Sequence, residues 1–177
     1  MDKLLVTVND IIQYRPMAKE MPQDRTEVYI QEAQRHDLMP ILGSALYYDF
    51  ITKYDQSGDP MYAAYQDLLN GSVWTYNGFS KQHYGLKPIV AYFAFARIVS
   101  NQRLNVTRYG VTTKVNPNSE PAPDLSVNNL IAELKSVAVS YQNQTLEFLR
   151  ENETTYPLYS QAIERPVTNM GIKFFSI

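Results

Sequence analysis

The chain has 177 residues, 45% of them hydrophobic, and carries 16 basic and 18 acidic side chains, for a formal net charge of −2. This length fits one domain over residues 1–177 with a substantial core, and the balanced charge argues against a nucleic-acid-binding surface with a basic excess. The absence of cysteine excludes disulfides, thiolate catalysis and zinc–sulfur sites. The first residues are too short and too mixed for a signal peptide, so we expect synthesis inside the cell.

Tyrosine is unusually abundant, with 14 residues beside seven phenylalanines and one tryptophan. Tyrosine combines a large contact area with a polar handle, and it is enriched on surfaces that become buried on assembly. An aromatic-rich core explains the same composition equally well. Both interpretations stay open from the sequence.

The N-terminal segment predicts short elements. Residues 3–8 alternate loosely, as in an extended strand, and Asn9 or Asp10 is placed to cap a brief helical turn that ends at Pro16. A longer helix is expected over residues 24–35, with acidic side chains in its first turn, where the helix dipole favours them.

Two further helices are predicted before the first β-structure. Pro40 is expected to start a helix over residues 40–54, since proline suits the first turn. A turn at 56–60 ends it, and a short helix over 61–69 closes at Asn70-Gly71. The longer helix presents a core stripe with a spacing of four: Leu42, Leu46, Phe50 and Tyr54.

A β-hairpin is predicted over residues 73–79. Asn77-Gly78 lies between aromatic and β-branched residues, and this dipeptide is the strongest short-range signal for a two-residue hairpin turn.

The helix that follows, residues 86–103, is the most distinctive part of the chain. Between Pro88 and Val99 apolar residues fall on every face, so we expect a central helix buried all round. It is too short to span a bilayer. The one charge between Pro88 and Val99, Arg97, is expected to form a structural salt bridge, with Glu133 or Asp67 as the partner.

Residues 104–124 break the helical pattern. Residues 105–115 are rich in valine and threonine and fit either a hairpin or an extended arm, while the prolines of 116–123 exclude a helix. A connection this long is either functional or a disordered surface loop. We expect the arm to contact a neighbouring subunit through Val106, Arg108, Tyr109, Val111 and Lys114.

The last long helix is predicted over residues 126–152. Its outer face carries neutral polar side chains in place of charges. Such a face suits a wet contact with a partner, because neutral groups cost less to desolvate than charged ones. A simply solvated face is the alternative.

The C-terminal tail, residues 165–177, is predicted to be a docking element. Pro166 and Gly171 rule out a regular helix, yet four large apolar residues lie near the end and need cover. The tail packs either on its own domain, beside residues 4–8, or on an adjacent subunit or other partner protein. The four residues are Ile172, Phe174, Phe175 and Ile177.

No constellation for catalysis or cofactor binding is apparent. His36 and Glu32 share a helix face but make no metal site by themselves, and the 55–59 segment has the wrong glycine position for a calcium loop. There is no Gly-Lys-Ser/Thr phosphate loop. We therefore expect no enzyme activity, no cofactor and no metal.

The ordered series of motifs resembles a known family. The motifs are LGSALYYDF (42–50), YQDLLNG (65–71), WTYNG (74–78), GLKPIVAYFAFAR (85–97) and YGV (109–111). In this order, over about residues 5–150, they resemble the head–tail connector (adaptor) proteins of tailed bacteriophages, those of crAss-like phages above all.

The resemblance implies a mainly α fold: a helical adaptor bundle around a buried central helix, with a small β-hairpin and an extended arm. It implies a homo-oligomeric ring, commonly twelve-fold, that contacts the portal and other neck or tail proteins in the virion and lets DNA pass without specific binding or any membrane contact. The arm and the tail depart from the minimal adaptor. The alternative is a small helical binding module that holds a ligand in an aromatic pocket.

Overall fold

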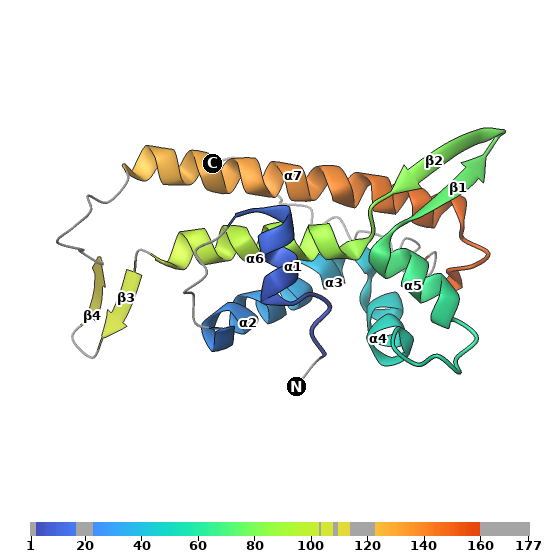
Figure 1. Cartoon of the computed structure of the whole chain (residues 1–177), viewed down its shortest axis with the longest axis horizontal. Helices are drawn as coiled ribbons and strands as arrows, with labels where there is room; N and C mark the ends of the chain where they lie inside the picture. Colours follow the sequence, from blue (N-terminus) through green and yellow to red (C-terminus); the bar gives the residue numbers. More distant parts are fainter. Residues whose placement is uncertain (1–2, 17–22, 103, 108–109, 114–122, 160–177) are drawn as a thin grey trace, which may run out of the picture.

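The computed structural model describes residues 3–16, 23–102, 104–107, 110–113 and 123–159, and it is mainly α-helical, as predicted (Figure 1). Two separate antiparallel hairpins, β1–β2 and β3–β4, complete it. The elements in chain order are α1 (Val8–Tyr14), α2 (Gln23–Glu32), the π-helix η1 (Ala33–Leu38), α3 (Met39–Leu42), α4 (Ser44–Lys53), α5 (Tyr62–Asn70), β1 (Ser72–Tyr76), β2 (Phe79–His83), α6 (Leu86–Gln102), β3 (Leu104–Thr107), β4 (Gly110–Thr113) and α7 (Asp124–Glu151).

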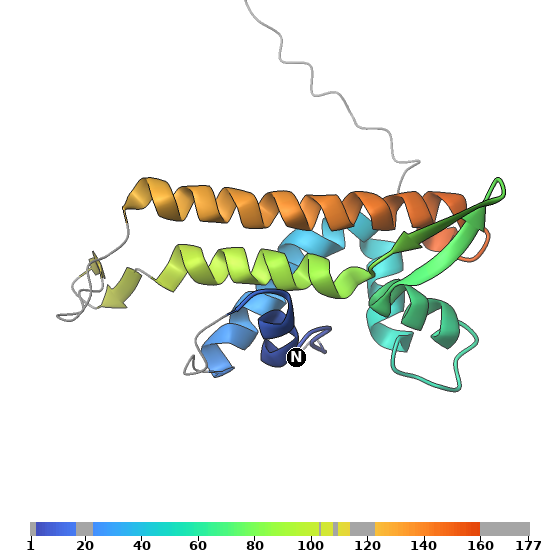
Figure 2. The same cartoon turned by 45° about the horizontal axis from the view of Figure 1, so that its top comes forward.

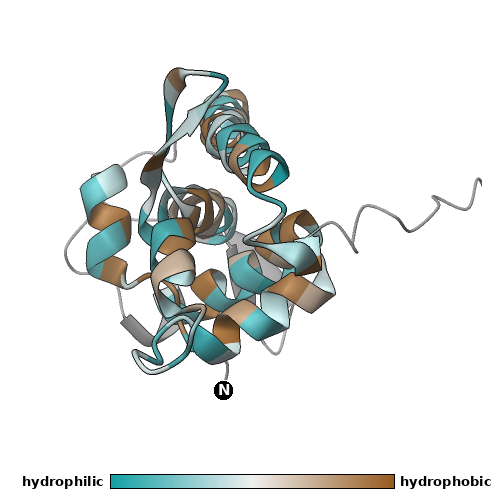
Figure 3. Ribbon diagram, turned by 90° about the vertical axis from the view of Figure 1, so that its right-hand side faces the viewer, coloured by the Kyte–Doolittle hydropathy of each residue, from teal (hydrophilic) through white to brown (hydrophobic). Residues whose placement is uncertain are grey.

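The central helix α6 is covered on every side, which confirms the prediction from its composition. Every residue between Leu86 and Val99 is buried or half-buried, and Ile89, Val90 and Ile98 are completely buried. The helix packs against α1, α2, η1, α5 and α7, and the view along the long axis of the molecule shows it within this ring of helices (Figure 3). The other core residues pack around this buried helix.

Among the described elements, the most extensive packing is between α6 and α7, which run antiparallel side by side (Figures 1 and 2). At 28 residues, α7 is about 42 Å long. Leu134, Ala138 and Leu149 form its buried side. The two hairpins lie at opposite ends of this helix pair (Figure 1).

The prediction of two helices separated before Pro40 is wrong: α2, η1 and α3 follow one another without a break. In an α-helix the proline ring would clash with the carbonyl of His36, four residues earlier. The chain widens into a π-turn directly before the proline, and the Met39 N–H bonds to the Gln34 carbonyl, five residues back. The π-turn thereby accommodates a proline inside a continuous helical rod.

The predicted helix 40–54 is instead divided at Gly43, whose backbone has φ 75° and ψ 150°. This residue separates α3 from α4. The predicted core stripe nevertheless holds, because Leu42, Leu46 and Phe50 are completely buried and Tyr54 is half-buried.

The N-terminal segment also differs from the prediction. Residues 3–7 form no strand, and Thr7, not Asn9 or Asp10, caps α1. Thr7 and Asp10 form a reciprocal capping box, in which each side chain accepts a hydrogen bond from the other residue's backbone N–H. The segment is held by the buried Gln34 amide, which accepts from the Leu5 N–H at 2.8 Å and donates to the carbonyl of Lys3 at 3.0 Å.

The hairpin predicted at Asn77-Gly78 is present. Both turn residues have positive φ, 50° and 80°, as a type I′ turn requires, and Trp74 lies opposite Lys81 in the register. Of the two alternatives for residues 105–115, the structure shows the hairpin: Val106 pairs with Val111 between β3 and β4.

The hairpin β1–β2 is anchored at its base by two glycines in close contact. Gly71 ends α5 with φ 93°, and Gly85 precedes α6 with φ 78°. A Cβ on Gly71 would lie 2.6 Å from the carbonyl oxygen of His83, and one on Gly85 would overlap the carbonyl oxygen of Leu69. Only glycine satisfies both the backbone angle and the space at these positions.

Gly85→Ala is expected to lower the free energy of unfolding by about 3 kcal/mol, since strain at positive φ adds to overlap with backbone atoms that cannot move aside. Chemical denaturation of the purified chain measures this. The matched control is Gly58→Ala, because a Cβ there meets nothing within 4 Å and should change stability by less than about 0.5 kcal/mol. Equal effects of the two variants would contradict this account of the hairpin base.

Candidate functional site

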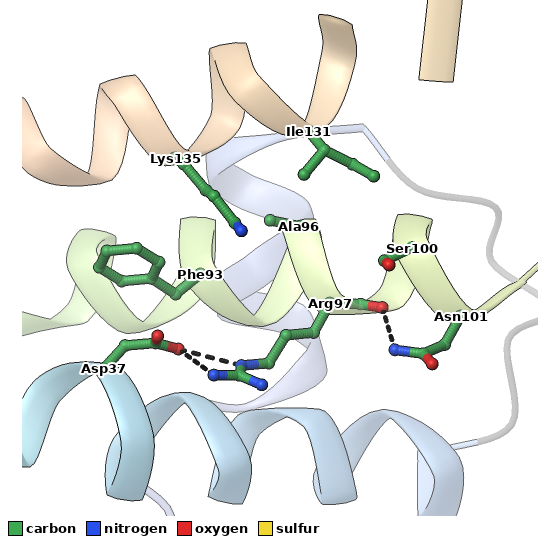
Figure 4. A pocket seen from close by; sticks show the side chains of 8 residues that line it. All are labelled: Asp37, Phe93, Ala96, Arg97, Ser100, Asn101, Ile131 and Lys135. Atoms are coloured by element: carbon green, nitrogen blue, oxygen red, sulfur yellow. Dashed lines mark hydrogen bonds and ion pairs between the residues drawn. The ribbon is translucent and has the colours of Figure 1, made fainter. Parts of the chain in front are cut away.

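Arg97 connects α6 to the α2–η1 rod (Figure 4). Its guanidinium donates from Nε to Asp37 Oδ2 at 3.0 Å and lies 2.8 Å from the same oxygen through Nη2. Glu32 Oε2 lies 3.5 Å from Nη1. The expected salt bridge is therefore present, but both predicted partners are wrong, because Glu133 pairs with Arg15 at 3.0 Å and Asp67 lies on α5.

Beside this ion pair lies a pocket of about 190 Å³ between α6, α7 and η1. Lys135 reaches into it from α7, and no ion pair of Lys135 is seen with the described residues (Figure 4). Asp37 is engaged by Arg97 and so offers no free base, whereas the Lys135 ammonium is able to donate hydrogen bonds to a carboxylate from outside. The full lining is Asp37, Phe93, Ala96, Arg97, Ser100, Asn101, Ile131 and Lys135.

A double-mutant cycle with Asp37→Asn and Arg97→Gln is expected to give a coupling energy of about 1–2 kcal/mol, as for a partly buried, charge-assisted pair. The pair has side-chain exposures of 22% and 29%. The control cycle uses Lys3→Gln and Asp55→Asn, a more exposed ion pair, with an expected coupling of about 0.5 kcal/mol. Urea denaturation measures both coupling energies. Equal values would show that the ion pair between Arg97 and Asp37 stabilises the fold no more than an exposed surface pair does.

A second polar cluster holds the inner face of the β1–β2 hairpin against the end of α7. Lys81 Nζ lies 2.6 Å from Glu151 and 2.8 Å from Glu147, and the Trp74 indole N–H donates to Glu151 at 2.7 Å. Desolvation raises the pKa of Glu151, but the hydrogen bonds from Lys81 and Trp74 outweigh it, and the pKa is lowered. The charged form of Glu151 is thus what clamps the hairpin.

His83 ends β2 and is completely buried, stacked on Phe148 at a centroid distance of 4.0 Å. Its Nδ1 accepts from the Gly85 N–H at 3.2 Å, so Nε2 carries the proton and donates to Ser72 Oγ at 3.1 Å. A histidine in this tautomer cannot take the serine proton, so Ser72 and His83 do not form a nucleophile–base pair. Burial lowers the pKa of His83 to about 4.

Because His83 stays neutral in the fold, stability is expected to fall on acidification. An unfolded histidine has a pKa near 6.5, so the unfolded chain binds a proton that the folded chain rejects as the pH falls from about 6.5 to about 4. Between about pH 7.5 and pH 5 this costs about 2 kcal/mol of unfolding free energy.

Urea denaturation at both pH values measures the loss. His83→Gln should remove most of this pH dependence even if its overall stability is lower. His36→Gln, at an exposed histidine in η1, is the control and should keep the wild-type dependence. An unchanged slope in His83→Gln would assign the acid sensitivity to other groups.

An aromatic pocket of about 340 Å³ lies between α4, α5 and the residues that follow α7. Tyr65 and Tyr156 stack at 6.4 Å in its wall, and the Tyr156 hydroxyl donates to the Ala64 carbonyl at 2.7 Å. Burial raises the pKa of both tyrosines, which keeps them neutral. Asp49 and Lys53 supply the polar groups of the pocket and pair with each other at 2.6 Å.

Two exposed surfaces carry no charge. The first, here called the hairpin face, is the side of β1–β2 that faces away from Trp74 and Lys81, and Val73 on this side is 63% exposed. It consists of Val73, Thr75, Ser80 and Gln82. Tyr76 and Phe79 lie near the turn on the opposite face, where the Lys81 ammonium is 4.9 Å from the centroid of the Tyr76 ring.

The second, here called the neutral stripe, runs along the exposed side of α7 with spacings of four and three residues. Its charged neighbours, Glu133 and Lys135, lie to either side of it on the helix. It consists of Leu125, Asn129, Ala132, Ser136, Val139 and Asn143, all of them exposed.

Few of the predicted contact residues are placed by the structure. Val106 and Val111 lie opposite each other in β3–β4, at the end of the molecule away from β1–β2 (Figure 1). The others fall outside the described residues: Arg108, Tyr109, Lys114, Ile172, Phe174, Phe175 and Ile177. The hairpin face was missed, although the alternation of Val73 and Thr75 with Trp74 was a signal for it.

The fold and its ion pairs define a mainly α protein built on an antiparallel helix pair with a β-hairpin at each end. It belongs to a family of unknown function (DUF6712), whose model matches residues 38–168 and so includes α4–α7 and both hairpins. Comparisons with curated proteins and with solved structures found no match. Among the residues that the structure describes, no helix combines the length and apolar character needed to cross a membrane.

Proposed function

We propose that this chain is a structural protein of the virion neck in a tailed bacteriophage. In this proposal it forms a homo-oligomeric ring, commonly twelve-fold in such connectors, below the portal. The ring extends the DNA channel and docks the next tail component. The chain is made in the host cytoplasm and acts without cofactor or catalysis.

The observation that carries this proposal is the arrangement of uncharged, exposed surfaces along an elongated helix pair. Two-stranded sheets project at both ends of α6–α7, and each has free edges among the described residues (Figure 1). Residues such as Phe79 and Leu125, both 72% exposed, gain from cover by another molecule. Different surfaces at the two ends suit head-to-tail contacts, which close into a ring when the rotation between successive copies adds up to a full turn.

The placement of the motifs adds support. Four of those that resemble connector proteins build one connected region: 42–50 forms the start of α4, 65–71 the end of α5, 74–78 the hairpin and 85–97 the central helix. The resemblance thus rests on the part of the chain that forms the core around α6. The formal net charge of −2 suits a channel in which DNA slides without a tight, salt-dependent grip.

The proposal predicts that the full chain, produced with the portal protein encoded in the same genome, joins it in a ring-shaped complex. Native mass spectrometry and electron microscopy of the complex measure copy number and shape, and labelled chain should be found at the head–tail junction of purified particles. Particles that contain no copies of the chain would overturn the proposal.

The aromatic pocket favours a second candidate, a binding module for a small apolar ligand. Its volume of about 340 Å³ lies within the range of ligand sites. A shift of the unfolding temperature by a small aromatic compound, abolished in Met61→Trp but kept in Val28→Ser, would support this candidate. Its failure leaves the ring proposal in place.

A further inference from the structure

We propose that the aromatic pocket between α4 and α5 is the docking site for residues 172–177 of the same chain, here called the apolar segment. One of its two phenylalanines is the anchor. The segment lies outside the part of the chain that the structure describes. The inference does not rest on the proposed ring, because it concerns a contact within one copy.

The chain leaves its described part at the wall of this pocket. After α7 it returns to α4 and α5 (Figure 1), where the Tyr156 hydroxyl is hydrogen-bonded to a carbonyl of α5. Pro157 and Leu158 come next and line the pocket. Tyr159 is buried, and its N–H bonds to the Tyr156 carbonyl at 3.0 Å. Residues 160–177 therefore begin beside the pocket.

The short connection favours a contact within one copy. Phe174 and Phe175 follow Tyr159 by about 15 residues, which span at most about 50 Å and are long enough to lead back to a pocket beside their own start. A segment joined to its receptor by a short connection binds as if it were present at about millimolar concentration. In dilute solution a second copy is far below that concentration.

The pocket has the size and lining for an aromatic ring. A cavity of about 150 Å³ holds a benzene molecule, and this pocket measures about 340 Å³ with Met61 and Tyr65 in its wall. Its two charged groups, Asp49 and Lys53, pair with each other. The pocket beside Lys135 is smaller, at about 190 Å³, and its lining includes three charged side chains. It suits an apolar anchor less well.

Both sides of the contact have apolar surface to cover. Met61 and Leu158 are only half-buried at the pocket, and a phenylalanine seated there shields them from water. The apolar segment has one charged residue, Lys173, and four large apolar ones: Ile172, Phe174, Phe175 and Ile177.

The absence of native cysteine allows a direct test by disulfide cross-linking of the full chain. The variant Lys53→Cys/Ser176→Cys places one cysteine at the pocket and one next to Phe175, and it keeps both phenylalanines. Under mild oxidation in dilute solution it should form an intramolecular disulfide about tenfold faster than Val28→Cys/Ser176→Cys, whose first cysteine lies on α2, outside the pocket. Non-reducing gels and peptide mass spectrometry measure the rate and the pairing.

The matched control adds Phe174→Ser and Phe175→Ser to the Lys53→Cys/Ser176→Cys variant. The loss of the anchors should remove the difference in rate. Equal rates for the variants at Lys53 and Val28 would overturn the proposal. Disulfide-linked dimers in place of the intramolecular bond would assign the segment to another copy and overturn it as well.

Stability measurements test the same contact without cross-linking. Phe174→Ser/Phe175→Ser should lower the unfolding temperature of the full chain by roughly 5 °C, since a buried aromatic anchor is lost. In the background of Met61→Trp, whose indole occupies the pocket, the same two changes should lower it by less than about 1 °C. The same fall in both backgrounds, or no fall in either, would show that the segment packs elsewhere, beside residues 4–8 or on a partner, and would contradict the contact.

The proposed function and this contact fail separately, because both tests use the isolated chain. Particles without the chain would overturn the ring and leave the contact standing. A chain found in the neck that shows neither the fast cross-link nor the non-additive stability would do the reverse.

Discussion

The need to cover α6 on every side governs this structure. A helix with apolar residues all round is stable only when other elements replace water over its whole circumference. Helices α1, α2, η1, α5 and α7 do so. Between Pro88 and Val99, Arg97 is the one charged residue. Asp37 and Glu32 balance its charge at the surface of the core.

The same constraint explains how charge is distributed. Ion pairs connect the elements that surround α6: Arg15 on the segment after α1 reaches Glu133 on α7, and Lys81 on β2 reaches Glu151. Because these pairs lie between elements, they fix mutual positions more than they add stability, as expected for partly exposed charges. The hairpin face and the neutral stripe lie on parts of the surface that contribute no residue to these ion pairs.

The sequence predicts the structure correctly where the local pattern of residues alone determines an element. The burial of α6, the Asn77-Gly78 turn and the long α7 follow from local patterns. The π-turn of η1 was not predictable, since it depends on how Pro40 is accommodated within a packed rod, and the partners of Arg97 depend on that turn. The tyrosines divide between core and surface: Tyr47 and Tyr65 are buried, whereas Tyr76 is 42% exposed.

The contact between Gly71 and Gly85 has a consequence for how such a protein can diversify. It sets the direction of the β1–β2 hairpin through backbone atoms, with no outward side chain involved. The outer residues of the hairpin are thus free to change identity while the hairpin keeps its angle to α6. Related chains are then able to exchange one binding preference for another by surface substitutions alone, on a scaffold whose geometry stays constant.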